Sequence, residues 1–189
     1  YATTLNNHTP TAAALIAAFY YIYAFAQGHT SSRTDMIMTG LLLGLASAFD
    51  HGAALLCIGF SLYLFLLNKK LYLCIVLPAS LLPLITNSLL TYAAVGTWLP
   101  IQMQPELYST VSNYWHNGPQ HLVDALEPPK WRYALHFLIG HHGIFSFSPV
   151  LCFALPPLLK RLNKNSPDFP YSLIVVCSFL GMLLYYILN

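Results

Sequence analysis

The sequence predicts an all-α protein, a polytopic transmembrane helical bundle with about six spans and one long outer loop. Hydrophobic residues make up 57% of the chain and charged residues only 7%, whereas a soluble domain carries about 25% charged residues. Because so few charges cannot cover a surface that faces water on all sides, a lipid bilayer is the predicted surrounding and partner. The net charge of +2 is too small to indicate a nucleic-acid partner.

The first half of the chain predicts four membrane spans, at residues 11–26, 36–49, 52–67 and 71–98. The apolar run from 36 to 67 is too long for one ordinary span, and the ionisable pair Asp50 and His51 divides it into two short helices. Gly40 and Gly44 lie one turn apart, and small residues at this spacing predict close packing against another helix.

Pro78 and Pro83 interrupt the fourth run, so we expect a kinked or broken helix there. A long polar segment follows at residues 99–143, and its tyrosines and tryptophans suit the headgroup layer of a bilayer. Two short interfacial helices are expected in this loop, at residues 105–115 and 130–140. Two further spans are predicted after it, at residues 144–159 and 171–188.

The positive charges predict an orientation for these spans. Of the eight Lys and Arg residues, all but Lys130 and Arg132 lie in three loops on one side, namely Arg33, Lys69, Lys70, Lys160, Arg161 and Lys164. Short loops rich in Lys and Arg stay in the cytoplasm. The long loop and every histidine except His29 are therefore expected outside a bacterial plasma membrane. Because the chain starts at Tyr1 and stops inside an apolar run, we expect a single transmembrane domain, residues 1–189, cut from a longer protein.

The outer side holds the candidate functional residues. The stretch Leu135 to Pro149 joins the polar segment to the fifth span and places His141 and His142 between two glycines. Histidines at this depth can bind phosphate, shuttle protons or hold a metal. Neither HExxH nor HxxxH spacing occurs, so a zinc site is not predicted, and a divalent cation is the one cofactor that stays open.

Three stretches resemble polytopic glycosyltransferases of the GT-C fold. They are LNNHTPTAAALIAAFYYIYAF (5–25), GLLLGLASAFDHGAALL (40–56) and GHHGIFSFSPVLCFALPPL (140–158). The family includes the dolichyl-phosphate-mannose-protein mannosyltransferase and bacterial proteins similar to the lipid A arabinosyltransferase. In these proteins a Lys or Arg commonly follows the turn of the second stretch, where Asp50 and His51 stand here.

The resemblance implies transfer of a sugar from a polyprenyl-phosphate carrier to an acceptor on the outer side of the membrane. The catalytic acid of such enzymes usually lies in a first outer loop, which would precede Tyr1. The departing phosphate needs cationic or hydrogen-bonding partners, and the candidates are Asn6, Asn7, His8, Asp50, His51, Lys130, Arg132, His141 and His142. Arg132 is preferred because a guanidinium fork suits phosphate. Two alternatives stay open, a piece of a transporter or permease and a non-catalytic membrane scaffold.

Overall fold

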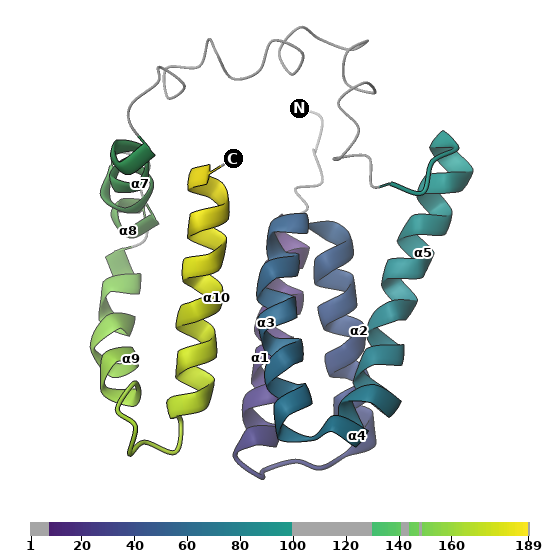
Figure 1. Cartoon of the computed structure of the whole chain (residues 1–189), viewed down its shortest axis with the longest axis horizontal. Helices are drawn as coiled ribbons and strands as arrows, with labels where there is room; N and C mark the ends of the chain where they lie inside the picture. The colour runs from purple at the N-terminus through teal and green to yellow at the C-terminus, as the bar shows by residue number, and fades with distance from the viewer. Residues whose placement is uncertain (1–7, 100–129, 141–143, 148, 189) are drawn as a thin grey trace, which may run out of the picture. The chain divides into compact units, whose positions relative to one another are not determined.

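The computed structural model describes residues 8–99, 130–140, 144–147 and 149–188 of the chain (Figure 1). Every regular element in these residues is a helix, which confirms the all-α class. The chain divides into a first unit, residues 1–86 with 156–185, and a second unit, residues 87–155 with 186–189. The elements are α1 (His8–Ala26), α2 (Arg33–Phe49), α3 (His51–Leu67), α4 (Lys69–Leu71), η1 (Tyr72–Val76), α5 (Leu77–Val95), α7 (Lys130–Ile139), α8 (Ile144–Phe147), η6 (Pro149–Ala154), α9 (Leu155–Arg161) and α10 (Phe169–Leu188).

Asp50 separates α2 from α3, as the sequence predicts. Its backbone is extended, with φ −144° and ψ 118°, so the apolar run cannot continue as one helix. The Asp50 carboxylate caps the new helix by accepting the backbone N–H of Gly52 at 2.8 Å. A cap of this kind satisfies one of the amide groups that the first turn of a helix leaves without a partner.

The helix from Lys69 to Val95 is irregular before its prolines rather than broken at them. Residues Tyr72–Val76 form a π-helical turn, in which the N–H of Leu77 donates to the carbonyl of Tyr72, five residues earlier. A proline ring crowds the carbonyl four residues before it, so a wider turn directly ahead of Pro78 accommodates the ring. Pro83 lies inside α5 without ending the helix.

The predicted fifth span, residues 144–159, is not one helix. It consists of α8, then the 3-10 helix η6 and then α9, which ends at Arg161. Pro149 begins η6 and Pro156 lies in the first turn of α9, positions where a missing N–H is tolerated. The expected helix at 130–140 corresponds to α7, whereas the one at 105–115 lies outside the described residues.

Two of the described helices are long and apolar enough to cross a membrane, rather than six. They are α1, with 19 residues, and the continuous helix Lys69–Val95, with 27 residues. The split at Asp50 leaves α2 and α3 with 17 residues each, or about 25 Å, slightly less than the ~30 Å hydrocarbon core of a bilayer. Shorter apolar helices occur at Gly52–Leu67 and Phe169–Gly181.

The core of the first unit lies between α1, α2, α3 and η1, and α10 packs against it. Phe60 of α3 is fully buried and stacks on Phe19 of α1, with ring centroids 4.0 Å apart. Tyr171 of α10 meets the ring of Phe60 at 5.6 Å, and its hydroxyl donates to the backbone carbonyl of Phe19 at 3.3 Å. Aromatic rings therefore join three helices that are far apart in the sequence.

Gly40 and Gly44 bring α2 into backbone contact with η1 and α5. A Cβ added to Gly40 would lie 2.4 Å from the carbonyl oxygen of Val76, and one added to Gly44 would lie 2.1 Å from that of Ser80. Real Cβ atoms do not approach a carbonyl so closely, so each position requires glycine for steric reasons. The predicted close packing at these two residues is confirmed.

We expect Gly44→Ala to lower the free energy of unfolding by about 1–3 kcal/mol, because the new methyl group meets backbone that cannot rotate away. The matched control is Gly181→Ala in α10, where an added Cβ meets nothing within 4 Å. An alanine there should leave stability unchanged or raise it by up to about 1 kcal/mol, since alanine is the better helix former. Denaturation in mixed micelles, followed by tryptophan fluorescence, measures both, and equal effects would contradict the packing argument.

Candidate functional site

His8 and Asp50 meet at one end of the first unit. The imidazole Nδ1 of His8 lies 2.8 Å from Oδ2 of Asp50. His8 begins α1 and Asp50 follows α2, and because these helices run antiparallel, the two residues reach the same end (Figure 1). The side chain of His8 is 67% exposed and that of Asp50 only 18%. The histidine is therefore the solvent-facing member of the pair.

The two oxygens of Asp50 have different partners. Oδ1 accepts the Gly52 N–H and Oδ2 faces His8. Because an ionised carboxylate only accepts hydrogen bonds, Nδ1 of His8 is the donor in this contact. Such a pair can take up a proton on the imidazole and stabilise the resulting cation with the carboxylate.

The other predicted site residues fall into three groups. Asn6, Asn7, His141 and His142 lie outside the described residues. His51 and Lys130 begin α3 and α7, and their side chains are likewise outside the described part. Arg132 is exposed on α7 in the second unit. Of the predicted candidates with described side chains, the structure brings together His8 and Asp50.

Metal ligands do not gather in the described part of the chain. No group of three or more His, Cys, Asp or Glu side chains lies close enough there to hold a metal ion. The His8–Asp50 pair by itself supplies two ligands, fewer than a protein zinc site uses.

Asp168 is the centre of a second polar cluster, which the sequence did not predict. Its carboxylate accepts from Nε2 of Gln27 at 2.5 Å and from the hydroxyl of Tyr23 at 3.4 Å, and it lies 3.5 Å from Nε of Arg161. The Asp168 side chain is 15% exposed. These contacts attach the loop before α10 to the end of α1. The signal in the sequence was a single acid directly before an apolar helix, in the stretch 160–170, KRLNKNSPDFP.

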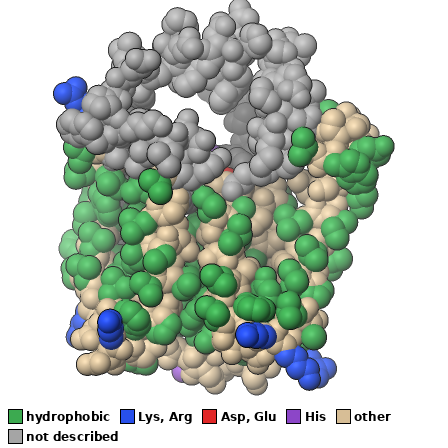
Figure 2. Space-filling model, in the orientation of Figure 1, with side chains coloured by type: hydrophobic (Ala, Val, Ile, Leu, Met, Phe, Trp, Pro, Cys, Tyr) green, Lys and Arg blue, Asp and Glu red, His purple; other side chains and the backbone are tan. Residues whose placement is uncertain are grey.

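The Asp168 cluster lies at the opposite end of the first unit from His8. The α1–α2 loop and the α3–α4 turn share this end because the helices alternate in direction (Figure 1). The α9–α10 loop joins them through the contact between Gln27 and Asp168. All the basic residues of the first unit lie in or beside these three connections, namely Arg33, Lys69, Lys70, Lys160, Arg161 and Lys164. Between the ends, the helices expose apolar side chains (Figure 2). The side chain of Ile16 in α1, for example, is 69% exposed.

Comparison with known proteins gives no relative for this chain. No protein-family model matches it, and no curated protein or solved structure matches it either. The resemblance to GT-C glycosyltransferases therefore stays a prediction.

Two substitutions at Asp50 separate its capping from its charge. Asparagine caps a helix as well as aspartate does, so Asp50→Asn should lose only the ion pair, less than about 1 kcal/mol for an exposed partner. Asp50→Ala removes the cap as well and should cost about 1 kcal/mol more. The same micelle denaturation measures both free energies, and an equal loss in the two variants would show that the cap contributes nothing.

Proposed function

We propose that the chain is the helical membrane domain of an enzyme that transfers a sugar from a polyprenyl-phosphate carrier to an acceptor outside the plasma membrane. The observation that carries the proposal is the division of charge in the first unit. Its basic residues lie at one end, and the His8–Asp50 pair lies at the other. The choice of a sugar and a polyprenyl-phosphate carrier as substrates comes from the resemblance to GT-C glycosyltransferases.

A bilayer accounts for the apolar surface of the helices. Side chains such as Ile16, Ile58 and Leu66 are exposed between the two ends of the first unit. Exposing apolar area to water costs about 25 cal/mol per Å², and lipid removes this cost. The proposed spans are α1, α2, α3, the helix Lys69–Val95 and α10, with the broken α8–α9 segment as the remaining one. The 17-residue helices α2 and α3 are at the lower limit of a span.

The positive charges favour one orientation of this bundle. Lys and Arg in short loops are retained in the cytoplasm during insertion. The end that carries the α9–α10 loop is therefore the cytoplasmic one, and His8 and Asp50 face the outer side. This is the side on which polyprenyl-phosphate sugars are used in the resembling family.

Sugar transfer of this kind needs a proton acceptor. The acceptor hydroxyl forms a new bond to the anomeric carbon, and the bond from that carbon to the carrier phosphate breaks with its electrons on the phosphate. The hydroxyl proton must leave at the same time. His8 can receive it and Asp50 can stabilise the imidazolium. In the resembling family a further catalytic acid lies in a first outer loop, so the pair would act beside such an acid.

Transport of a lipid-linked substrate is the second candidate. It is favoured by the π-helical turn Tyr72–Val76 ahead of Pro78, since such irregular turns often occur at functional sites. Transport moves the substrate across the bilayer without consuming it, which distinguishes the two functions.

Cysteine labelling tests the orientation. In a variant whose four natural cysteines are replaced by serine, Thr9→Cys should react with a membrane-impermeant maleimide added to intact cells. Asn165→Cys, in the α9–α10 loop, should react only after the membrane is opened. The reverse pattern would show that the orientation is inverted.

Sugar transfer is tested with the full-length protein in proteoliposomes, supplied with polyprenyl-phosphate mannose or polyprenyl-phosphate arabinose. Asp50→Asn and His8→Gln should each lower kcat by about 100-fold or more, the range for loss of a general base. The double variant should be little worse than either, because the two residues act as a unit. The matched control is Asp35→Asn, an acid in the first turn of α2. Unchanged donor consumption in Asp50→Asn would contradict the role of the pair, and donor movement without consumption would favour transport.

A further inference from the structure

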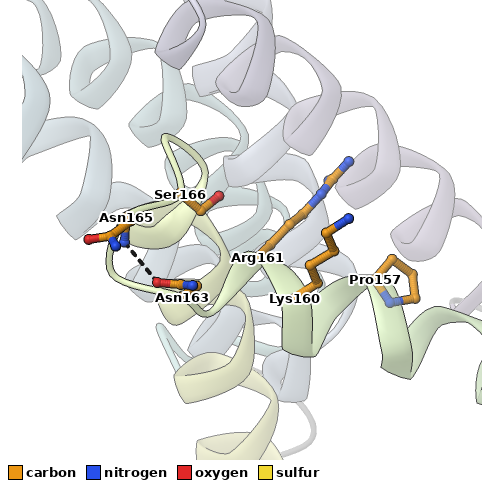
Figure 3. A pocket seen from close by; sticks show the side chains of 6 residues that line it. All are labelled: Pro157, Lys160, Arg161, Asn163, Asn165 and Ser166. Carbon is orange, nitrogen blue, oxygen red and sulfur yellow. Dashed lines mark hydrogen bonds between the residues drawn. The ribbon is translucent and has the colours of Figure 1, made fainter.

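The last turn of α9 and the α9–α10 loop line an open pocket of about 520 Å³ at the cation-rich end of the first unit (Figure 3). Its volume lies within the roughly 300–1,000 Å³ of small-molecule sites. The pocket is open to one side, and one helix end with the loop after it supplies all of its lining residues, which are Pro157, Lys160, Arg161, Asn163, Asn165 and Ser166.

The lining of the α9–α10 pocket consists mainly of cations and hydrogen-bond donors. Lys160 and Arg161 extend to the same side of the last turn of α9 (Figure 3). Arg161 contacts Asp168 through Nε at 3.5 Å, and its guanidinium carries two further Nη groups that match phosphate oxygens. Of the described ion pairs none includes Lys160, so its charge is not neutralised there.

The loop is held in shape by its own hydrogen bonds. Oδ1 of Asn163 accepts the N–H of Asn165 at 3.0 Å, which leaves the Asn163 amide group to act as a donor. Ser166 Oγ accepts the N–H of Asp168 at 3.3 Å, so its hydroxyl proton can point elsewhere. With the loop fixed in this way, a phosphate would meet donors that are already in position.

Exposed apolar side chains lie on the two helices that the α9–α10 loop connects. Leu159, directly before Lys160, is 67% exposed, and Leu173 in the first turns of α10 is exposed as well. A ligand with a phosphate and two long hydrocarbon chains matches this combination of a cationic pocket and apolar helix surfaces. Its phosphate would lie at the cations and its chains along α9 and α10. A free phosphate would use only the first of the two surfaces.

We infer that the α9–α10 pocket binds the phosphate of an anionic phospholipid headgroup from the cytoplasmic leaflet. The inference rests on the membrane placement proposed above and is independent of sugar transfer. Lys160 supplies the charge that favours an anionic over a zwitterionic lipid, and Asp168 holds Arg161 at the edge of the pocket. Anionic lipids are concentrated in that leaflet, and each basic side chain near its surface contributes to their binding.

The test is native mass spectrometry of the full-length protein, released from micelles that contain equal amounts of phosphatidylglycerol and phosphatidylcholine. The unmodified protein should retain phosphatidylglycerol in preference, and Lys160→Gln should lower that preference about fivefold, the effect of one basic residue at a membrane surface. Lys160→Arg keeps the charge and should restore the preference. The matched control is Lys164→Gln, which removes a charge from the same loop but not from the pocket lining.

Three outcomes would overturn the inference. In the first, the unmodified protein would retain the two lipids equally and so show no selectivity. In the second, Lys164→Gln would lower the preference for phosphatidylglycerol as much as Lys160→Gln, which would assign the preference to the charge of the loop as a whole. In the third, inorganic phosphate would raise the thermal stability of the lipid-free protein in detergent, and Lys160→Gln would abolish that effect. The site would then belong to a free phosphate. Equal retention of the two lipids by an unmodified protein that does transfer sugar would disprove the pocket alone, so the two proposals fail separately.

Discussion

The end of the first unit that carries His8 depends on the contacts of one carboxylate, that of Asp50. Its extended backbone ends α2, one oxygen begins α3 by capping Gly52, and the other oxygen faces His8 at the start of α1. Three helices therefore meet at one side chain. A charged group in such an apolar run is expensive in lipid unless it has partners or faces water, and these contacts satisfy the first of the two conditions.

Asp168 performs the equivalent task at the other end of the unit. It connects α1 to α9 and α10 through Gln27, Tyr23 and Arg161. The difference is the charge around it, because the Asp168 end carries basic side chains and the Asp50 end carries a histidine. The polar contacts of the first unit are thus concentrated at its two ends, around Asp50 and Asp168. The helix surfaces between these ends expose apolar side chains, a distribution that suits a bilayer. The rings of Phe60 and Tyr171 pack against each other in the core of the unit.

Local chemistry made much of this fold predictable from the sequence. The break at Asp50 and the close approach at Gly40 and Gly44 were predicted because an ionisable residue and small residues constrain their own neighbourhood. The broken segment 144–159 was predicted as one helix because hydropathy does not depend on where in a helix a proline lies. Here the prolines lie at the start of η6 and in the first turn of α9. For the site, the sequence predicted that His8 and Asp50 lie on the same side of the membrane. The two residues are 42 positions apart, and their contact follows only from helix packing. The contacts of Asp168 with Gln27 and Tyr23 join residues 141 and 145 positions apart, so the one local signal, an acid directly before an apolar helix, did not indicate its partners.

The glycine contact between α2 and the helix beside it also sets the axial register of α2. Met36, Gly40, Gly44 and Ala48 follow one another at intervals of four residues and so lie along one face. A shift of α2 by one turn in one direction would bring the Cβ of Met36 to the place of Gly40, where the carbonyl of Val76 leaves no room. A shift in the other direction would bring the Cβ of Ala48 to the place of Gly44, where the carbonyl of Ser80 leaves no room. Both directions are blocked, so the helix has a single height relative to its neighbour. Because Asp50 follows the last residue of α2, that height also determines how far the carboxylate projects beyond the apolar part of the bundle.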